Sequence, residues 1–135
     1  MSVQFSTSVR NAMLDVIETT IGTAAVLKIR SGTVPATCAT ADAGTSLVSY
    51  TLASDWAAAA SSGAKALSSL PLSTTAGASG TAAHYRIYAS DGTTCHEQGT
   101  VTATGGGGDM TVDNTSINSG QTVNITAFTK TMGGA

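Results

Sequence analysis

Apolar and methyl-bearing residues near the start of the chain recur at intervals of three and four positions. They are Val9, Ala12, Met13, Val16, Ile17, Thr20 and Ile21. This spacing lays one stripe along a helix, so we predict a helix over about residues 8–21 whose stripe packs against the rest of the protein. Thr7 or Ser8 can cap its start, and Gly22 can end it in a left-handed conformation.

Beyond Gly22 the pattern changes to a period of two, which is typical of strands. In the first such run, Ala25, Leu27 and Ile29 alternate with Val26, Lys28 and Arg30. The alternation predicts a strand with one buried face and one basic face in contact with water. Further strands are predicted within residues 46–54, 64–70, 81–89, 94–103, 109–117 and 122–131.

Turn and loop signals separate these runs. Residues 31–37 and 71–80 are predicted to be loops, the second a flexible connector. Tight hairpins are predicted at residues 90–93, which contain Asp-Gly, and at residues 118–120. One helix followed by many short strands indicates a mainly β protein, with residues 1–135 forming a single antiparallel β-sandwich or jelly-roll-like domain. Parallel α/β folds are excluded, because no helices separate the strands.

The chain carries little charge. Charged residues are 10% of its 135 residues, and the formal net charge is −2. A surface with so few charges favours a protein that is assembled with copies of itself or with a partner. The six basic residues are widely separated and aromatic residues are few, which argues against nucleic-acid binding. The start lacks the features of a secretory signal and no apolar run suits a membrane helix, so we expect synthesis in the cytoplasm and no membrane partner.

Cys95, His96 and Glu97 are the densest group of potentially reactive side chains. They lie on the returning strand of the predicted hairpin at 90–93, where neighbouring side chains point to opposite faces. Adjacency in sequence therefore argues against a catalytic pair. A cross-strand cluster of His84, His96 and Glu97 is a weak metal site, because it has too few ligands. We expect no catalytic residues, metal or cofactor, and a polar face for solvent or subunit contacts.

Two further features concern cysteines and aromatic residues. Whether Cys38 meets Cys95 is left open, although two thiols in a cytosolic product are more often reduced. Trp56 lies in a loop-like run and is a candidate exposed anchor, whereas Tyr85 and Tyr88 point to opposite sides of a strand and cannot form one platform. The predicted partner-binding residues are Trp56, Tyr88, His84 and His96.

Three stretches carry a resemblance to a known group of proteins. They are VRNAMLDVIETTIG followed by AAVLKIRSGTVPA, the central AAHYRIYASDGTT, and the closing DMTVDNTSINSGQTVNITAFTKTM. With them the chain resembles small virion proteins of tailed bacteriophages, in particular capsid decoration or cement proteins.

The resemblance implies a structural virion protein without catalytic residues. Such a protein binds the major capsid protein on the outer surface of the capsid as a homo-oligomer, a trimer or dimer, after synthesis in the bacterial host cytoplasm. The termini, residues 1–7 and 132–135, would be flexible alone and would order on the shell. The alternatives are a phage tail or surface β-sandwich module that binds a receptor or glycan, and a fibre or pilus subunit.

Overall fold

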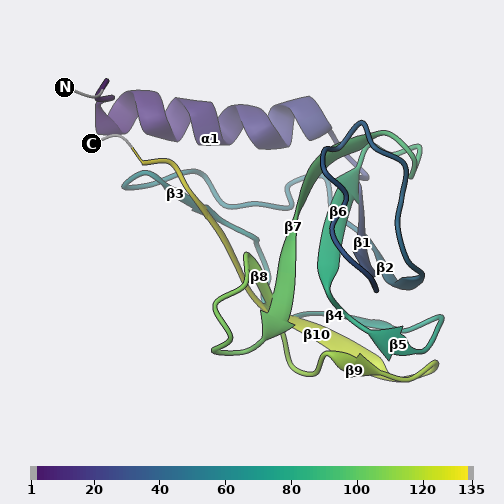
Figure 1. Cartoon of the computed structure of the whole chain (residues 1–135). Coiled ribbons are helices and arrows are strands. Elements are labelled where there is room, and N and C mark those ends of the chain that lie inside the picture. Colours follow the sequence, from purple (N-terminus) through teal and green to yellow (C-terminus); the bar gives the residue numbers. More distant parts are fainter. Residues whose placement is uncertain (1–2, 134–135) are drawn as a thin grey trace.

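The computed structural model describes residues 3–133, which form one helix followed by ten strands. The helix α1 (Thr7–Ile21) lies along one side of the strands (Figure 1). The strands are β1 (Val26–Arg30), β2 (Ser46–Thr51), β3 (Ala64–Ala66), β4 (Leu72–Thr75), β5 (Gly80–Thr81), β6 (His84–Tyr88), β7 (Cys95–Ala103), β8 (Met110–Val112), β9 (Ser116–Ile117) and β10 (Thr122–Thr131).

Eight of the described strands belong to one hydrogen-bonded sheet with the order β2-β1-β6-β7-β8-β10-β3, and β4 also pairs with β10. The strands β5 and β9 form a separate two-stranded sheet. The predicted mainly β class with one N-terminal helix is confirmed. This pairing does not confirm the predicted sandwich or jelly roll, because most strands belong to one sheet that curls on itself (Figure 1).

The strand β1 follows the predicted alternation except at its end. Leu27 and Ile29 are buried in the main core, whereas Val26 and Lys28 are half-buried. Arg30 was predicted to face water, but it is buried. Its guanidinium group donates hydrogen bonds to the carbonyl oxygens of Ala43 and Gly44 at 3.0 and 3.1 Å, which provide the partners that a buried charge requires.

The predicted hairpin at residues 90–93 is confirmed, since β6 and β7 are antiparallel neighbours on either side of it. Asp91 accepts hydrogen bonds from the backbone N–H groups of Thr93 and Thr94, and Gly92 has a φ of 72°. Residues of the turn itself therefore supply the hydrogen bonds and the backbone conformation that it needs.

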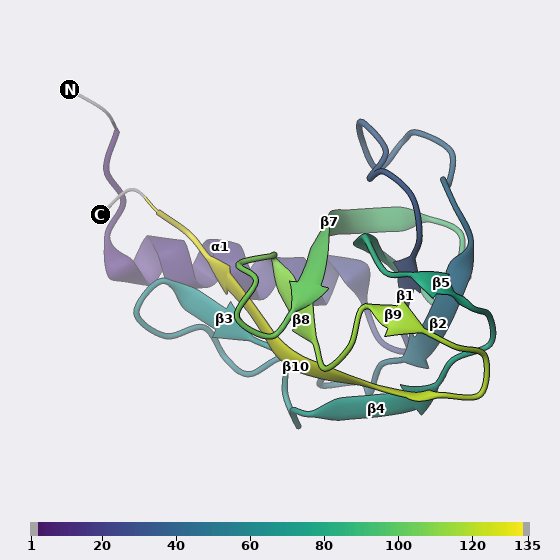
Figure 2. The same cartoon turned by 60° about the horizontal axis from the view of Figure 1, so that its bottom comes forward.

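The hairpin predicted at residues 118–120 is wrong, because β9 pairs with β5 and not with β10. Instead, β10 pairs in succession with β4, β8 and β3 along its length (Figure 2). Residues 71–80 were predicted to be a flexible connector, yet they contain β4 and the first residue of β5. Their backbone groups become ordered by pairing with segments far away in the sequence.

The pair β7 and β8 is parallel, which corrects the prediction of a purely antiparallel sheet. Only residues 104–109 connect the two strands, although parallel neighbours normally need a crossover of a dozen or more residues. The glycine run makes this short connection possible. A Cβ atom on Gly106 would lie 2.7 Å from Cβ of Thr102, and Gly105 and Gly107 have φ values of 85° and 80°.

The ends of the described chain are tied to the fold. Ser6, and not Thr7 or Ser8 as predicted, caps α1 by accepting a hydrogen bond from the N–H of Val9. Met132 donates to the carbonyl oxygen of Gly63 and accepts from Arg10. Ser6 and Met132 therefore each have a defined hydrogen-bond partner in the fold, and the flexibility of the termini stays a prediction. That prediction also covers residues 1–2 and 134–135, which lie outside the described range.

Candidate interaction surface

His84, a predicted contact residue, is fully buried on β6. Its Nδ1 atom lies 2.9 Å from the carbonyl oxygen of Gly32, and its strand partner is Thr100. The cross-strand cluster with His96 and Glu97 does not form. Burial lowers the pKa of His84 and outweighs the effect of the Gly32 hydrogen bond, so the ring is neutral at pH 7. A surface contact role for His84 is wrong for the protein as folded here.

Tyr88 is also fully buried, where it belongs to a charged cluster. Its hydroxyl donates to Asp42 at 2.7 Å, and Arg86 makes an ion pair with the same carboxylate at 2.7 Å. Burial opposes ionisation of Asp42, but hydrogen bonds from Tyr88 and Arg86 outweigh it and hold the pKa of the carboxyl below its usual value. These contacts hold the loop between β1 and β2 against the sheet, so Tyr88 stabilises the fold and is not an exposed anchor.

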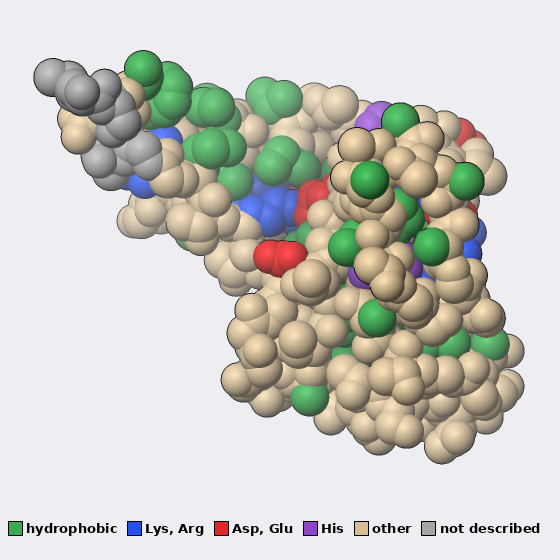
Figure 3. All heavy atoms as spheres, viewed as in Figure 1, with side chains coloured by type: hydrophobic (Ala, Val, Ile, Leu, Met, Phe, Trp, Pro, Cys, Tyr) green, Lys and Arg blue, Asp and Glu red, His purple; other side chains and the backbone are tan. Residues whose placement is uncertain are grey.

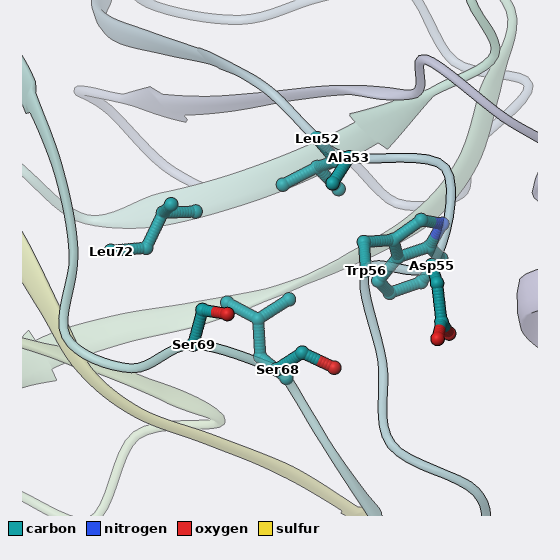
Figure 4. A pocket seen from close by; sticks show the side chains of 8 residues that line it. Leu52, Ala53, Asp55, Trp56, Ser68, Ser69 and Leu72 are labelled. Carbon is teal, nitrogen blue, oxygen red and sulfur yellow. The ribbon is translucent and has the colours of Figure 1, made fainter.

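Trp56 was predicted as an exposed anchor, but only 3% of it is accessible. The indole N–H donates to the carbonyl oxygen of Gly22 at 3.4 Å, and Nζ of Lys130 lies 5.4 Å from the ring centroid. Beside the ring is a hollow of about 60 Å³, shown with Leu52 and Leu72 in Figure 4. Small-molecule pockets are several times larger, about 300–1,000 Å³, so this hollow does not fit a saccharide unit.

His96 is the one predicted contact residue that is exposed. It borders a hollow of about 210 Å³ whose other lining residues all belong to the second half of α1. They are Val16, Ile17, Thr20 and Ile21. The hollow is open and mainly apolar in its lining, and it lies where the second half of α1 meets His96 on β7.

The polar side of α1 faces the protein. Lys65 on β3 is buried and makes ion pairs with Asp15 at 2.8 Å and Glu18 at 3.0 Å. The two carboxylates also accept hydrogen bonds from the backbone N–H groups of Ala60 and Ala57. The hydrogen bond from Lys65 lowers the pKa of Asp15, so the contact is strongest when Asp15 is ionised. The helix is therefore attached by charge and backbone polarity as well as by packing.

The predicted stripe of α1 packs inward at its end, where Ile21 is buried in the core and Ile17 packs against it, but most of the stripe faces outward, contrary to expectation. Leu14, which does not belong to the stripe, is only 1% exposed, whereas Val16 is 58% exposed. Among the described residues, the exposed large hydrophobic side chains all belong to α1 or to the segment before it. They are Val3, Phe5, Val9, Met13 and Val16. In the space-filling view, apolar side chains gather along the helix (Figure 3). We call these five residues the apolar face.

The residues Cys95, His96 and Glu97 enter three separate environments. The sulfur of Cys95 contacts the sulfur of Cys38, and Glu97 accepts a hydrogen bond from the Tyr85 hydroxyl at 2.8 Å. His96 faces outward. Within residues 3–133 no group of three or more His, Cys, Asp or Glu side chains is arranged to hold a metal ion.

Compared with known proteins, the chain matches no family model, no curated protein and no solved structure. Across the described residues, no helix combines the length and the apolar character needed to cross a membrane.

Proposed function

We propose that this protein is a structural virion protein, which binds the major capsid protein on the outer surface of a phage capsid and stabilises the shell. The apolar face of α1 is the observation that carries the proposal. Contiguous apolar surface that the protein does not bury itself is characteristic of protein contact sites. The choice of a capsid as the partner rests on the resemblance of the sequence to decoration proteins.

The attachment of α1 supports this role. Asp15, Glu18 and Lys65 hold the polar side of the helix, so that the opposite side is presented in a fixed orientation. A partner then binds a preorganised surface and loses little conformational entropy of this chain. The five side chains of the apolar face are hydrophobic, so covering them does not itself desolvate a charge. Repetition over a symmetric shell, with the protein as a homo-oligomer, would make a modest contact effective.

The aromatic residues considered for glycan binding do not form a surface platform. Tyr50, Trp56, Tyr85 and Tyr88 are all buried, and the aromatic ring that is exposed, Phe5, belongs to the apolar face.

Cosedimentation with undecorated phage heads tests the proposal. The proteins to compare are the wild type, the double variant Met13→Ser/Val16→Ser, and Thr19→Ser. Thr19 is exposed on the same helix but lies beside the apolar face, which makes it a matched control. We expect saturable binding by the wild type and the control, and at least about tenfold weaker binding by the double variant, since about 1.4 kcal/mol of lost contact free energy suffices.

Circular dichroism and thermal unfolding establish that all three proteins are folded to the same extent. Equal binding by the double variant would exclude the apolar face as the attachment surface. No binding of the wild type to heads would exclude the capsid, and a glycan array with the same protein would then test the receptor alternative.

A further inference from the structure

Cys38 and Cys95 are 57 positions apart in the sequence, yet their sulfur atoms lie 2.9 Å apart. This is closer than the roughly 3.5–4.0 Å at which even smaller carbon atoms pack without a bond. A disulfide has an S–S distance of about 2.05 Å, so bond formation requires the sulfurs to approach by about 0.9 Å. A small rotation of the two side chains provides that movement.

The backbone on the Cys38 side is fixed by contacts that do not involve sulfur. Arg86 donates to the carbonyl oxygens of Thr37 and Thr40, at 2.9 and 3.0 Å, on either side of the cysteine. The side-chain N–H of Gln98 donates to the carbonyl oxygen of Pro35 at 2.6 Å. The loop is therefore held in place whether or not a bond joins the thiols.

The backbone on the Cys95 side is fixed as well. Cys95 is the first residue of β7 and lies opposite Tyr88 in the ladder with β6. Both cysteines are partly accessible, and the neighbours of Cys38, Thr37 and Ala39, are exposed. An oxidant can therefore reach the pair through the loop.

We propose that Cys38 and Cys95 are a site of intramolecular disulfide formation, with a small disulfide of the oxidised glutathione class as the oxidant. The Cys38 thiol loses its proton, and its thiolate attacks one sulfur of the oxidant, forming a mixed disulfide and releasing one glutathione thiolate. The Cys95 thiol then loses its proton, attacks the Cys38 sulfur and releases the second glutathione. The released thiolates take up the two protons, and two electrons pass to the oxidant.

The order of attack follows from the surroundings of the two thiols. Burial and the hydrogen bond with Cys38 raise the pKa of Cys95 to about 12, so Cys95 is a poor first nucleophile at neutral pH. The Cys38 side meets the reagent first, and Cys95 resolves the mixed disulfide at short range. This inference does not depend on the proposed capsid role.

The bond is expected to stabilise the fold, because it closes a long loop in the unfolded chain. For a protein of this length the expected rise in thermal midpoint is on the order of 10 °C. The coupling between folding and disulfide formation is reciprocal. A disulfide that stabilises the folded state must therefore form more readily in the folded than in the unfolded chain.

The test uses the full chain, purified in the reduced form and equilibrated with mixtures of oxidised and reduced glutathione. Maleimide labelling under denaturing conditions counts the remaining thiols, and intact mass distinguishes loss of two hydrogens from addition of glutathione. A digest without reductant identifies the linked peptides. Cys38→Ser and Cys95→Ser are the control variants, since each keeps a similar shape and only one thiol.

We expect the wild type to lose both thiols and two hydrogens, and to reach half-oxidation at a glutathione ratio at least about tenfold more reducing when folded than in urea. Cys95→Ser, which keeps Cys38, is expected to form only a mixed disulfide, and Cys38→Ser, which keeps the poorer nucleophile, is expected to form it more slowly. Retention of both thiols, stable glutathione addition to the wild type, disulfide-linked dimers, or the same ratio in urea would each overturn the proposal. If a serine variant fails to fold, the comparison of wild type with and without urea decides alone.

Discussion

Replacing Leu14 with Ala, and separately Met13 with Ala, tests which face of α1 the protein uses for its own stability. The two residues are adjacent in sequence, but Leu14 is 1% exposed and Met13 is 39% exposed. Alanine keeps the helix propensity high in both variants. Differences between them therefore report the packing of the two faces.

The expected magnitudes differ strongly. Truncating a buried leucine costs about 2–5 kcal/mol, and we expect about 3 kcal/mol here because α1 packs on one side only. For a chain of this length, that loss lowers the thermal midpoint by roughly 10 °C. Met13 already meets solvent, so its truncation should change the free energy of unfolding by about 0.5 kcal/mol or less.

Urea unfolding followed by circular dichroism measures both values. The measurement is made at two protein concentrations, because contact between copies through the apolar face would make stability depend on concentration. An equal loss of unfolding free energy in the two variants, or a larger loss for Met13→Ala, would refute the orientation in which Leu14 faces the protein and Met13 faces outward.

Three further predictions concern the sheet and its loops. Asp42→Asn is expected to lower the free energy of unfolding in urea by about 2 kcal/mol, because Arg86 loses its charged partner; the loss is moderate because Asp42 is itself partly exposed. Since the folded state lowers the pKa of Asp42, the wild type has this stability above pH 3.8 and loses it as the pH falls further. The variant should not show this loss at low pH. His84 has a lowered pKa, so the unfolded chain takes up its proton first, and stability should fall by up to about 1 kcal/mol between pH 7.5 and 5.5; His84→Asn should abolish the difference. Gly106→Ala should cost about 1–3 kcal/mol because its Cβ meets a threonine side chain, whereas Gly77→Ala, with open space around it, should be nearly neutral, and the contrary ranking in thermal unfolding would refute the steric argument.

Local patterns predicted the local elements well. The helix at about 8–21, the strand ending at Arg30 and the hairpin at 90–93 all correspond to elements in the structure. Each depends mainly on residues that are close together in sequence, such as Asp91, which accepts a hydrogen bond from the N–H of Thr93 in the same turn. The physical cause of these elements is therefore contained in the pattern itself.

The orientation of the helix could not be read in the same way. Asp15 and Glu18 look like a solvent-facing side in an amphipathic pattern, yet their partners lie on the segment 57–65. That segment has no regular alternation, so nothing in the sequence indicates that its backbone N–H groups are free to bind carboxylates. The stripe that predicts the helix therefore predicts the inward face correctly only at Ile17 and Ile21, and wrongly along the rest of the helix.

The burial of the predicted contact residues His84 and Tyr88 could not be predicted for a related reason. His84 and Tyr88 are polar residues on a strand, and their partners, Gly32 and Asp42, come from the loop between β1 and β2. A loop that packs against an interior strand such as β6 leaves no periodic pattern in the sequence. The parallel pairing of β7 and β8 could not be predicted either, because the six residues that connect them are fewer than a parallel crossover normally needs.

The strand β10 connects three parts of the sheet, and this has a consequence for how the protein folds. Until residues 122–131 are in place, β3 and β4 lack the long strand with which they pair, and β8 is paired on one side only. These pairings join segments up to 67 positions apart, as in Thr131 with Ala64. The chain must therefore lose the entropy of closing long loops before strand pairing contributes favourable free energy. We therefore expect slow folding with a late, concerted step in which β10 pairs. In partly folded molecules that have not reached this step, the unpaired edges of β3, β4 and β8 are open to pairing with other chains.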